Sequence, residues 1–117
     1  MRIIGNNPQL SRQTQAIASG AITVGKPVIV NTNGTVSQVS GSVTLTTENY
    51  IGFAEDTTAN GQPVTVNTKG AVDENQSSLT SGQTYFVQAD GTLGTSADDP
   101  SVVAGTAVTA TKLIVKG

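Results

Sequence analysis

The sequence predicts an all-β fold, a small antiparallel sandwich or barrel built from hairpins. Of 117 residues, 18 are Thr, 14 are Val and 13 are Gly. β-Branched side chains suit a pleated sheet, and glycine supplies the backbone freedom that tight turns need. Short apolar segments also recur with turn signals between them, as in sandwiches and small barrels. Finally, one phrase occurs twice, as VGKPVIVNTNGTV at 24–36 and as NGQPVTVNTKGAV at 60–72.

The first 18 residues differ from the rest of the chain. They hold both arginines, several amide side chains and few apolar residues. We therefore expect residues 1–18 to form an extended N-terminal arm, either a frayed end or a segment that orders on a neighbouring subunit. Residues 19–117 are expected to form a single β domain. Its expected strands are 21–24, 28–30, 42–46, 50–54, 64–66, 85–87, 107–109 and 113–115.

The repeated phrase is interpreted as a hairpin, because it holds turn and strand residues but no reactive group. From Gly25 to Val36 it matches the second copy at eight of twelve positions, and a weaker third copy lies within 81–93. Lys69 argues against a type I′ turn, which needs two residues at positive φ. A type I turn followed by a glycine in the left-handed region fits all three copies.

A second internal echo supports the same interpretation. The segment Ile51-Gly52-Phe53-Ala54 resembles Ala104-Gly105-Thr106-Ala107, with glycine and alanine in register. The sequence therefore predicts a partial duplication of hairpin units within the domain. It is too short for a solenoid array.

Several classes of function are disfavoured by composition. The chain has no histidine and no cysteine, so the commonest general base, the commonest metal ligand and any disulfide are missing. Adjacent carboxylates such as Glu55-Asp56 and Asp73-Glu74 are expected to be solvated turn residues, without calcium-loop spacing. Six dispersed positive charges argue against a nucleic-acid groove. We expect no enzyme, no cofactor, no bound metal and no membrane segment, in a protein made in the cytoplasm.

Two expected strands carry apolar residues on both faces, at 28–30 and at 85–87. A small antiparallel sheet normally exposes one of its two faces to solvent. Ile29 and Phe86 are therefore candidates for packing against another subunit. The alternative is that loops of the same domain cover them.

The last third of the chain resembles a module found in virion structural proteins of tailed bacteriophages. That module carries L-T-x-G-x-x-Y-[YF]-V-x-x-D-G-T-L and then a V-x-A-G-x-A-x-x-[AS]-T-K-L-[IL]-[IV] tail. The upstream phrase G-x-P-V-x-V-N-T-[NK]-G is also similar to hairpins of the module. The positions that match are Leu79, Thr80, Gly82, Tyr85, Phe86, Val87, 90–93 and 102–115.

The resemblance implies a head decoration, or cement, protein with no catalytic residues. Such proteins stabilise the expanded capsid by bridging subunits of the major capsid protein, and they typically form homotrimers or other small oligomers. The expected location is the virion surface, and the alternative is a tail-fibre or host-surface receptor-binding module. The candidate residues for contact with the capsid or another subunit are Arg2, Ile3, Ile4, Arg12, Ile29 and Phe86.

Overall fold

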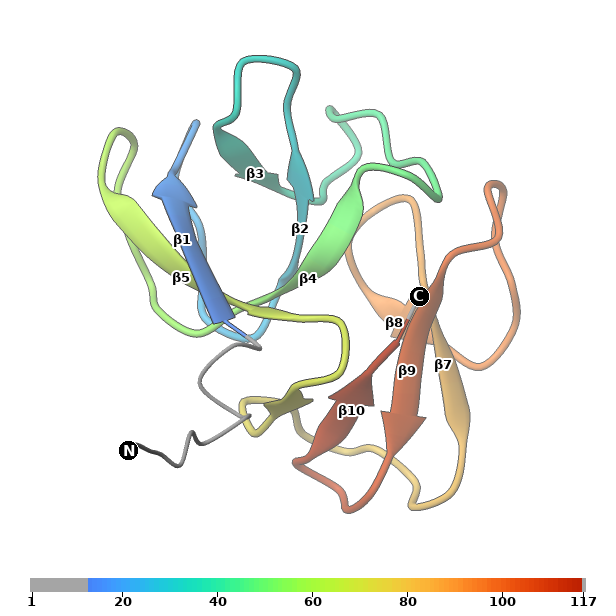
Figure 1. Ribbon diagram of the computed structural model, residues 1–117. Coiled ribbons are helices and arrows are strands. Elements are labelled where there is room, and N and C mark those ends of the chain that lie inside the picture. The colour runs from blue at the N-terminus through green and yellow to red at the C-terminus, as the bar shows by residue number, and fades with distance from the viewer. Residues whose placement is uncertain (1–12, 117) are drawn as a thin grey trace, which may run out of the picture.

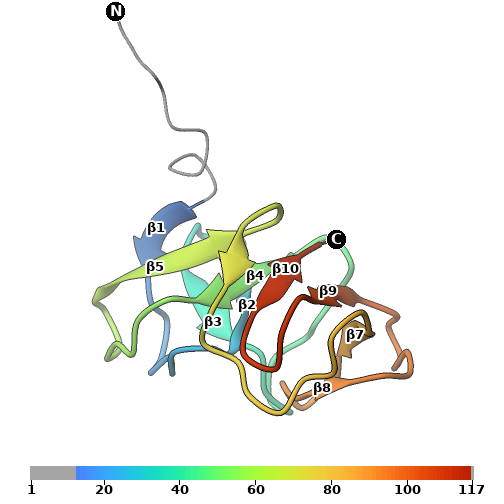
Figure 2. The same ribbon diagram turned by 90° about the horizontal axis from the view of Figure 1, so that it is seen from below.

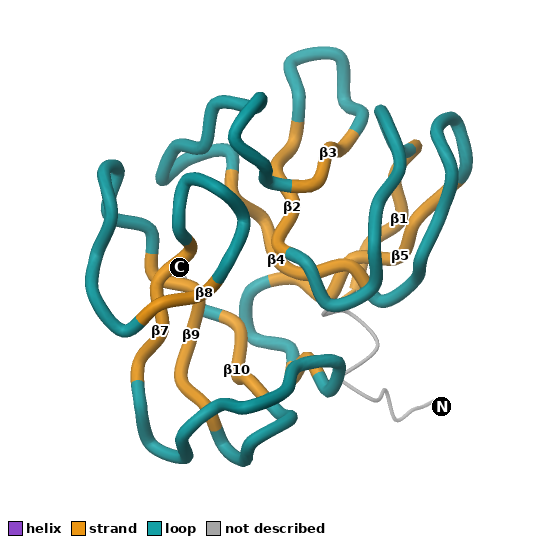
Figure 3. The backbone as a smooth tube through the Cα atoms, turned by 180° about the vertical axis from the view of Figure 1, so that it is seen from behind, coloured by secondary structure: helices purple, strands orange, loops and turns teal. Residues whose placement is uncertain are grey.

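The computed structural model describes residues 13–116 as two five-stranded antiparallel sheets, arranged like a sandwich (Figure 1). The all-β prediction is therefore confirmed. Figure 3 shows strands and loops only, and no helix of the described residues is long and apolar enough to cross a membrane. The strands are β1 (Gln13–Ile17), β2 (Pro27–Val30), β3 (Val36–Gln38), β4 (Tyr50–Ala54), β5 (Pro63–Thr68), β6 (Val72–Asp73), β7 (Thr84–Val87), β8 (Leu93–Gly94), β9 (Val103–Ala107) and β10 (Leu113–Val115).

The two sheets repeat one strand order. The first runs β1-β5-β4-β2-β3 and the second runs β6-β10-β9-β7-β8, so each strand has a counterpart five strands later. We call residues 13–68 the first half and residues 72–115 the second half. In Figure 1 the first half runs from blue to yellow-green, and the second half from yellow to red.

The hydrogen bonds that frame the counterpart strands repeat as well. The Gly25 N–H donates to the Ala54 carbonyl at 2.8 Å, and the Gly82 N–H donates to the Ala107 carbonyl at 2.8 Å. The two glycines have φ values of 83° and 82°. The chain is therefore a structural duplication, and its unit of five strands is larger than the hairpin that the sequence predicts.

The turns between β2 and β3 and between β7 and β8 are also counterparts. Thr35 Oγ1 donates to Asn33 Oδ1 at 2.7 Å, and Thr92 Oγ1 donates to Asp90 Oδ1 at 2.7 Å. The hydrogen bonds from Thr92 lower the pKa of the Asp90 carboxyl. In the first and third copies the turn has the predicted geometry: Gly34 and Gly91 have positive φ and their N–H groups donate to the Asn31 and Gln88 carbonyls at 3.0 Å and 2.9 Å. In the second copy the Ala71 N–H donates to the Thr68 carbonyl at 2.9 Å, so Gly70, also at positive φ, is the third residue of the turn and the prediction is wrong there.

The second copy of the phrase, however, does not form a hairpin, so that prediction is wrong. β5 pairs with β1 and β4, whereas β6 pairs with β10 of the other sheet. The Gly70 N–H in the intervening turn donates to the Val115 carbonyl at 2.8 Å. The turn therefore carries the chain from the first sheet to the second, as the yellow segment of Figure 2 shows.

The β structure begins earlier than the sequence predicts. Gln13 to Ile17 form β1, which pairs along its whole length with β5, and Ala18 is buried. These residues were expected in the arm because they are mostly polar. Four of the five residues of β1 are exposed. β1 is an edge strand whose only neighbour in the sheet is β5.

Two expected strands are instead irregular because side chains bind their backbone. In 42–46, Asn49 donates to the Thr44 carbonyl at 2.8 Å and accepts from the Thr46 N–H at 2.8 Å. In 21–24, only Ile22 forms a β-bridge, with Thr58. The apolar residues that alternate there are buried at Ile22 and Leu45, whereas Val24 is exposed.

Two apolar clusters form the core. One lies inside the curled first half and consists of Ala18, Ile22, Val28, Val36, Ala54, Val64 and Val66. The larger cluster joins the halves and consists of Ile29, Val39, Leu45, Tyr50, Phe53, Tyr85, Val87, Val102, Ala104, Ala107, Leu113 and Val115. The two halves are thus held together by apolar contact.

The duplication predicts that Gly52 and Gly105 have the same role. β2 and β7 each shift register beside one of these glycines. A Cβ atom at Gly52 would collide with the Asn67 carbonyl oxygen, and one at Gly105 would collide with the Ile114 carbonyl oxygen. Gly52→Ala and Gly105→Ala should each lower the free energy of unfolding by about 2 kcal/mol or more. Urea denaturation measures this change.

Gly41→Ala is the matched control, because a Cβ atom at Gly41 meets nothing within 4 Å. It should change the free energy of unfolding by less than about 0.5 kcal/mol. If Gly52→Ala or Gly105→Ala is as mild as this control, the two register shifts do not depend on glycine.

Candidate functional site

The region where the two halves meet, which we call the joint, contains a buried carboxylate. It belongs to Asp73 of β6, which is 0 % exposed. Its Oδ1 accepts hydrogen bonds from Asn67 Nδ2 at 3.0 Å and from Asn75 Nδ2 at 3.1 Å. Its Oδ2 accepts from Gln76 Nε2 at 2.7 Å. Amide donors therefore satisfy a charge that would otherwise be costly to bury.

The same amides extend the network to both halves. Asn67 Nδ2 and Asn75 Nδ2 also donate to Glu55 Oε1, at 2.7 Å and 3.0 Å. Gln76 Nε2 donates to the Gly25 carbonyl at 2.7 Å. We call this set the Asp73 network. Sequence reasoning missed it, because it treated Asp73-Glu74 as a solvated turn and had no signal for burial at Val72-Asp73.

Tyr50 is the second polar link across the joint. Its hydroxyl donates to the Ala104 carbonyl of β9 at 3.1 Å, and its ring meets Phe53 edge to face at 6.2 Å. Burial, together with the nearby charge of Asp73, raises the pKa of the Tyr50 hydroxyl well above its ordinary value. The phenol is therefore held in its neutral, donating form.

This raised pKa predicts a loss of stability in alkali. Above about pH 10 the unfolded chain ionises Tyr50 while the folded chain keeps the proton, so the free energy of unfolding falls as pH rises. The contribution is about 1.4 kcal/mol per pH unit at most. Tyr50→Phe should remove this part of the slope and lower stability by about 1 kcal/mol at pH 7.

Urea denaturation at pH 8 to 11 tests this prediction on the wild type and Tyr50→Phe. Tyr85→Phe is the control for the general effect of alkali. An unchanged slope in Tyr50→Phe would show that Tyr50 does not carry the alkaline destabilisation.

The outer face of the second sheet brings apolar side chains from neighbouring strands into register. Val72 pairs with Ile114, and Ile114 pairs with Thr106. Val72 is 45 % exposed, Ile114 is 36 % exposed and Phe86 of β7 is half-buried. We call Val72, Phe86, Val103, Thr106 and Ile114 the outer patch. Apolar side chains grouped in this way are typical of interaction surfaces.

The two predicted interface residues on strands have different environments. Ile29 is 4 % exposed and belongs to the cluster that joins the halves. Its cover is therefore intramolecular, the alternative that the sequence left open. Phe86 lies in the outer patch, and its contact with another subunit stays a prediction. Arg2, Ile3, Ile4 and Arg12 lie outside the described residues.

The intramolecular role of Ile29 predicts a folding defect. Ile29→Thr removes apolar volume and places a hydroxyl in the core, so the free energy of unfolding should fall by about 2–3 kcal/mol. Val30→Thr, at a 38 % exposed neighbour, should cost less than about 0.5 kcal/mol. Thermal or urea unfolding of the two variants gives the comparison, and equal stability would contradict the assignment.

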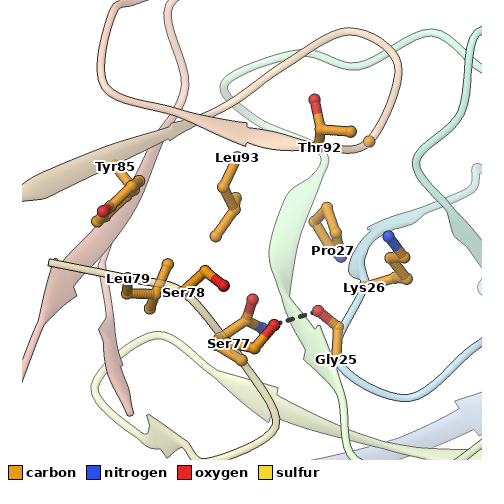
Figure 4. Close-up of a pocket in the computed structure, with 11 residues that line it drawn as sticks. Gly25, Lys26, Pro27, Ser77, Ser78, Leu79, Tyr85, Thr92 and Leu93 are labelled. Carbon is orange, nitrogen blue, oxygen red and sulfur yellow. Dashed lines mark hydrogen bonds between the residues drawn. The ribbon is translucent and has the colours of Figure 1, made fainter. Parts of the chain in front are cut away.

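A cavity of about 280 Å³ opens between the halves (Figure 4). The cavity is lined by residues 25–27, 76–79, Tyr85 and 91–93. Leu79, Tyr85 and Leu93 supply apolar surface, whereas Lys26 and the hydroxyls of Ser77, Ser78 and Thr92 supply polar groups. Such a mixture can hold a small polar ligand or a short peptide segment.

Among residues 13–116 no group of three or more histidine, cysteine or carboxylate side chains could hold a metal ion. Tyr50, Phe53 and Tyr85 are buried. The outer patch and the cavity are the candidate binding features that we consider among residues 13–116. Neither a protein-family model nor a curated protein sequence matches the chain.

Proposed function

We propose that this protein decorates the head of a tailed bacteriophage and stabilises the expanded shell by bridging subunits of the major capsid protein. The observation that carries the proposal is the resemblance of 79–93 and 102–115 to the phage virion module. In the fold these segments form the β7–β8 hairpin and the β9–β10 pair. These segments thus contain four of the five strands of the second half and are not scattered positions.

The outer patch gives the proposal a physical mechanism. It is built on β6, β10, β9 and β7, so it belongs largely to the segments that carry the resemblance. Burying Val72, Phe86 and Ile114 against the capsid would supply a modest apolar contribution for each copy. A lattice carries many copies, and homotrimers would contact several capsid subunits at once, so the contributions would add.

The alternative, a receptor-binding module of a tail fibre, has less support. A sugar-binding surface usually presents an exposed aromatic ring. Here Tyr50, Phe53 and Tyr85 are buried and Phe86 is half-buried.

The proposal predicts binding to undecorated, expanded phage heads. The full-length protein should co-sediment with such heads and raise their disruption temperature. Ile114→Glu should weaken binding by about tenfold or more, because a charge would be desolvated at the interface. Val30→Glu is the control, at a similarly exposed position in the first half.

Both variants must first unfold at the wild-type temperature, so that a loss of binding reports the surface and not the fold. Failure of the wild-type protein to bind expanded heads would overturn the proposed function. Equal binding by Ile114→Glu and the wild type would retain the function but reject the outer patch as the contact surface.

A further inference from the structure

The cavity is the opened counterpart of a closed core in the first half. Its apolar residues Leu79, Tyr85 and Leu93 each lie 57 residues after Ile22, Val28 and Val36. The latter three are 0 %, 0 % and 1 % exposed. In the second half Tyr85 is 7 % exposed, and Leu79 and Leu93 are only partly buried. The same framework therefore encloses its interior in one half and leaves it partly accessible in the other.

One extended segment closes the first half. Ala18 is 2 % exposed, belongs to the core cluster and forms a parallel β-bridge with Val36. The Ser19 N–H donates to the Val36 carbonyl at 2.7 Å. The Ala18 N–H donates to the Gln62 carbonyl at 2.8 Å. A short strand with one small side chain thus fills the gap beside β3.

The second half has no such segment beside β8. Thr14 and Asp73 are counterparts, because they pair with Val66 of β5 and Leu113 of β10. From Thr14 the chain takes eight residues to reach Ile22, but from Asp73 it takes only six to reach Leu79.

The shorter connection is also held at the joint. Asn75 and Gln76 donate to Asp73, and the Gln76 N–H donates to the Thr111 carbonyl at 3.2 Å. The Leu93 carbonyl is the counterpart of the Val36 carbonyl. Within residues 13–116 it accepts no hydrogen bond from a residue outside the β7–β8 pair. Figure 4 shows Leu93 on one side of the cavity and Ser77 to Leu79 on the other.

We infer that the cavity binds an extended peptide segment of a partner polypeptide, which adds as a short strand beside β8. In the bound state a backbone N–H of the peptide donates to the Leu93 carbonyl, as Ser19 does to Val36. An alanine-sized side chain enters between Leu79, Tyr85 and Leu93, as Ala18 does in the first half. Backbone bonds supply affinity and the cavity selects the side chain, as in other strand-addition sites. This inference does not rest on the proposed function.

The chain itself supplies the probe, a synthetic peptide with the sequence of residues 15–21, QAIASGA. We expect it to shift the backbone amide NMR signals of 77–79 and 91–94 in the full-length, ¹⁵N-labelled protein. The signal of Val36 should not move, because the protein's own segment already occupies that site. A peptide with aspartate in place of the alanine that corresponds to Ala18 should produce no shifts, since a charge cannot enter the apolar floor.

Ser77→Tyr, at the exposed rim of the cavity, should abolish the shifts, whereas Ser81→Tyr, outside the cavity lining, should preserve them. The comparison of the two peptides uses the wild-type protein, so it does not depend on the folding of either variant. Absence of shifts at millimolar peptide would overturn the inference, as would equal shifts from both peptides. Shifts of 77–79 and 91–94 with N-acetylglucosamine but not with the peptide would assign a saccharide site instead.

Discussion

The structure depends on the need to satisfy one buried charge. Asp73 has no solvent exposure, and its carboxylate is stable there because three amide side chains donate to it. One donor, Asn67, comes from β5 of the first half, and the other two follow β6. Removing a donor would leave the charge under-solvated, so the positions of β5, β6 and the segment at 75–76 are coupled.

This coupling explains how two halves with one strand order come to differ. Because Asn75 and Gln76 are held at the joint, the connection from β6 to Leu79 does not run beside β8. In the first half the corresponding connection is longer, and Ala18 reaches Val36. The open cavity of the second half therefore goes with a connection that is shorter and bound to the Asp73 network, whereas the longer connection of the first half closes its interior.

The fold was predictable where local chemistry determines backbone geometry. Glycine at the end of each turn, Pro27 and Pro63 at strand starts and β-branched strands all have local causes. Strand pairing was not predictable from the repeated phrase. The similar sequences NTNG and NTKG form turns closed by different hydrogen bonds, from Gly34 to Asn31 and from Ala71 to Thr68, and the strands that follow have different partners. Val72–Asp73 pairs with β10, and Asp73 there accepts hydrogen bonds from Asn67, Asn75 and Gln76.

The candidate site was predictable only in part. Phe86 was found because apolar residues on both faces of a short strand indicate a second contact. The same rule selected Ile29, where the second contact is the other half of the chain. Sequence alone could not separate the two residues, since the difference arises from the packing of the halves. The cavity had no local signal, because it results from a connection shortened by two residues.

The passage between the sheets has a topological consequence. The chain crosses from β5 to β6 once, through the short turn that contains Lys69 and Gly70, and both residues are exposed. Two molecules can therefore exchange second halves, each completing the other's joint with the contacts that a single chain makes with itself. Such domain-swapped dimers need no new complementary surface, and crowded refolding would favour them.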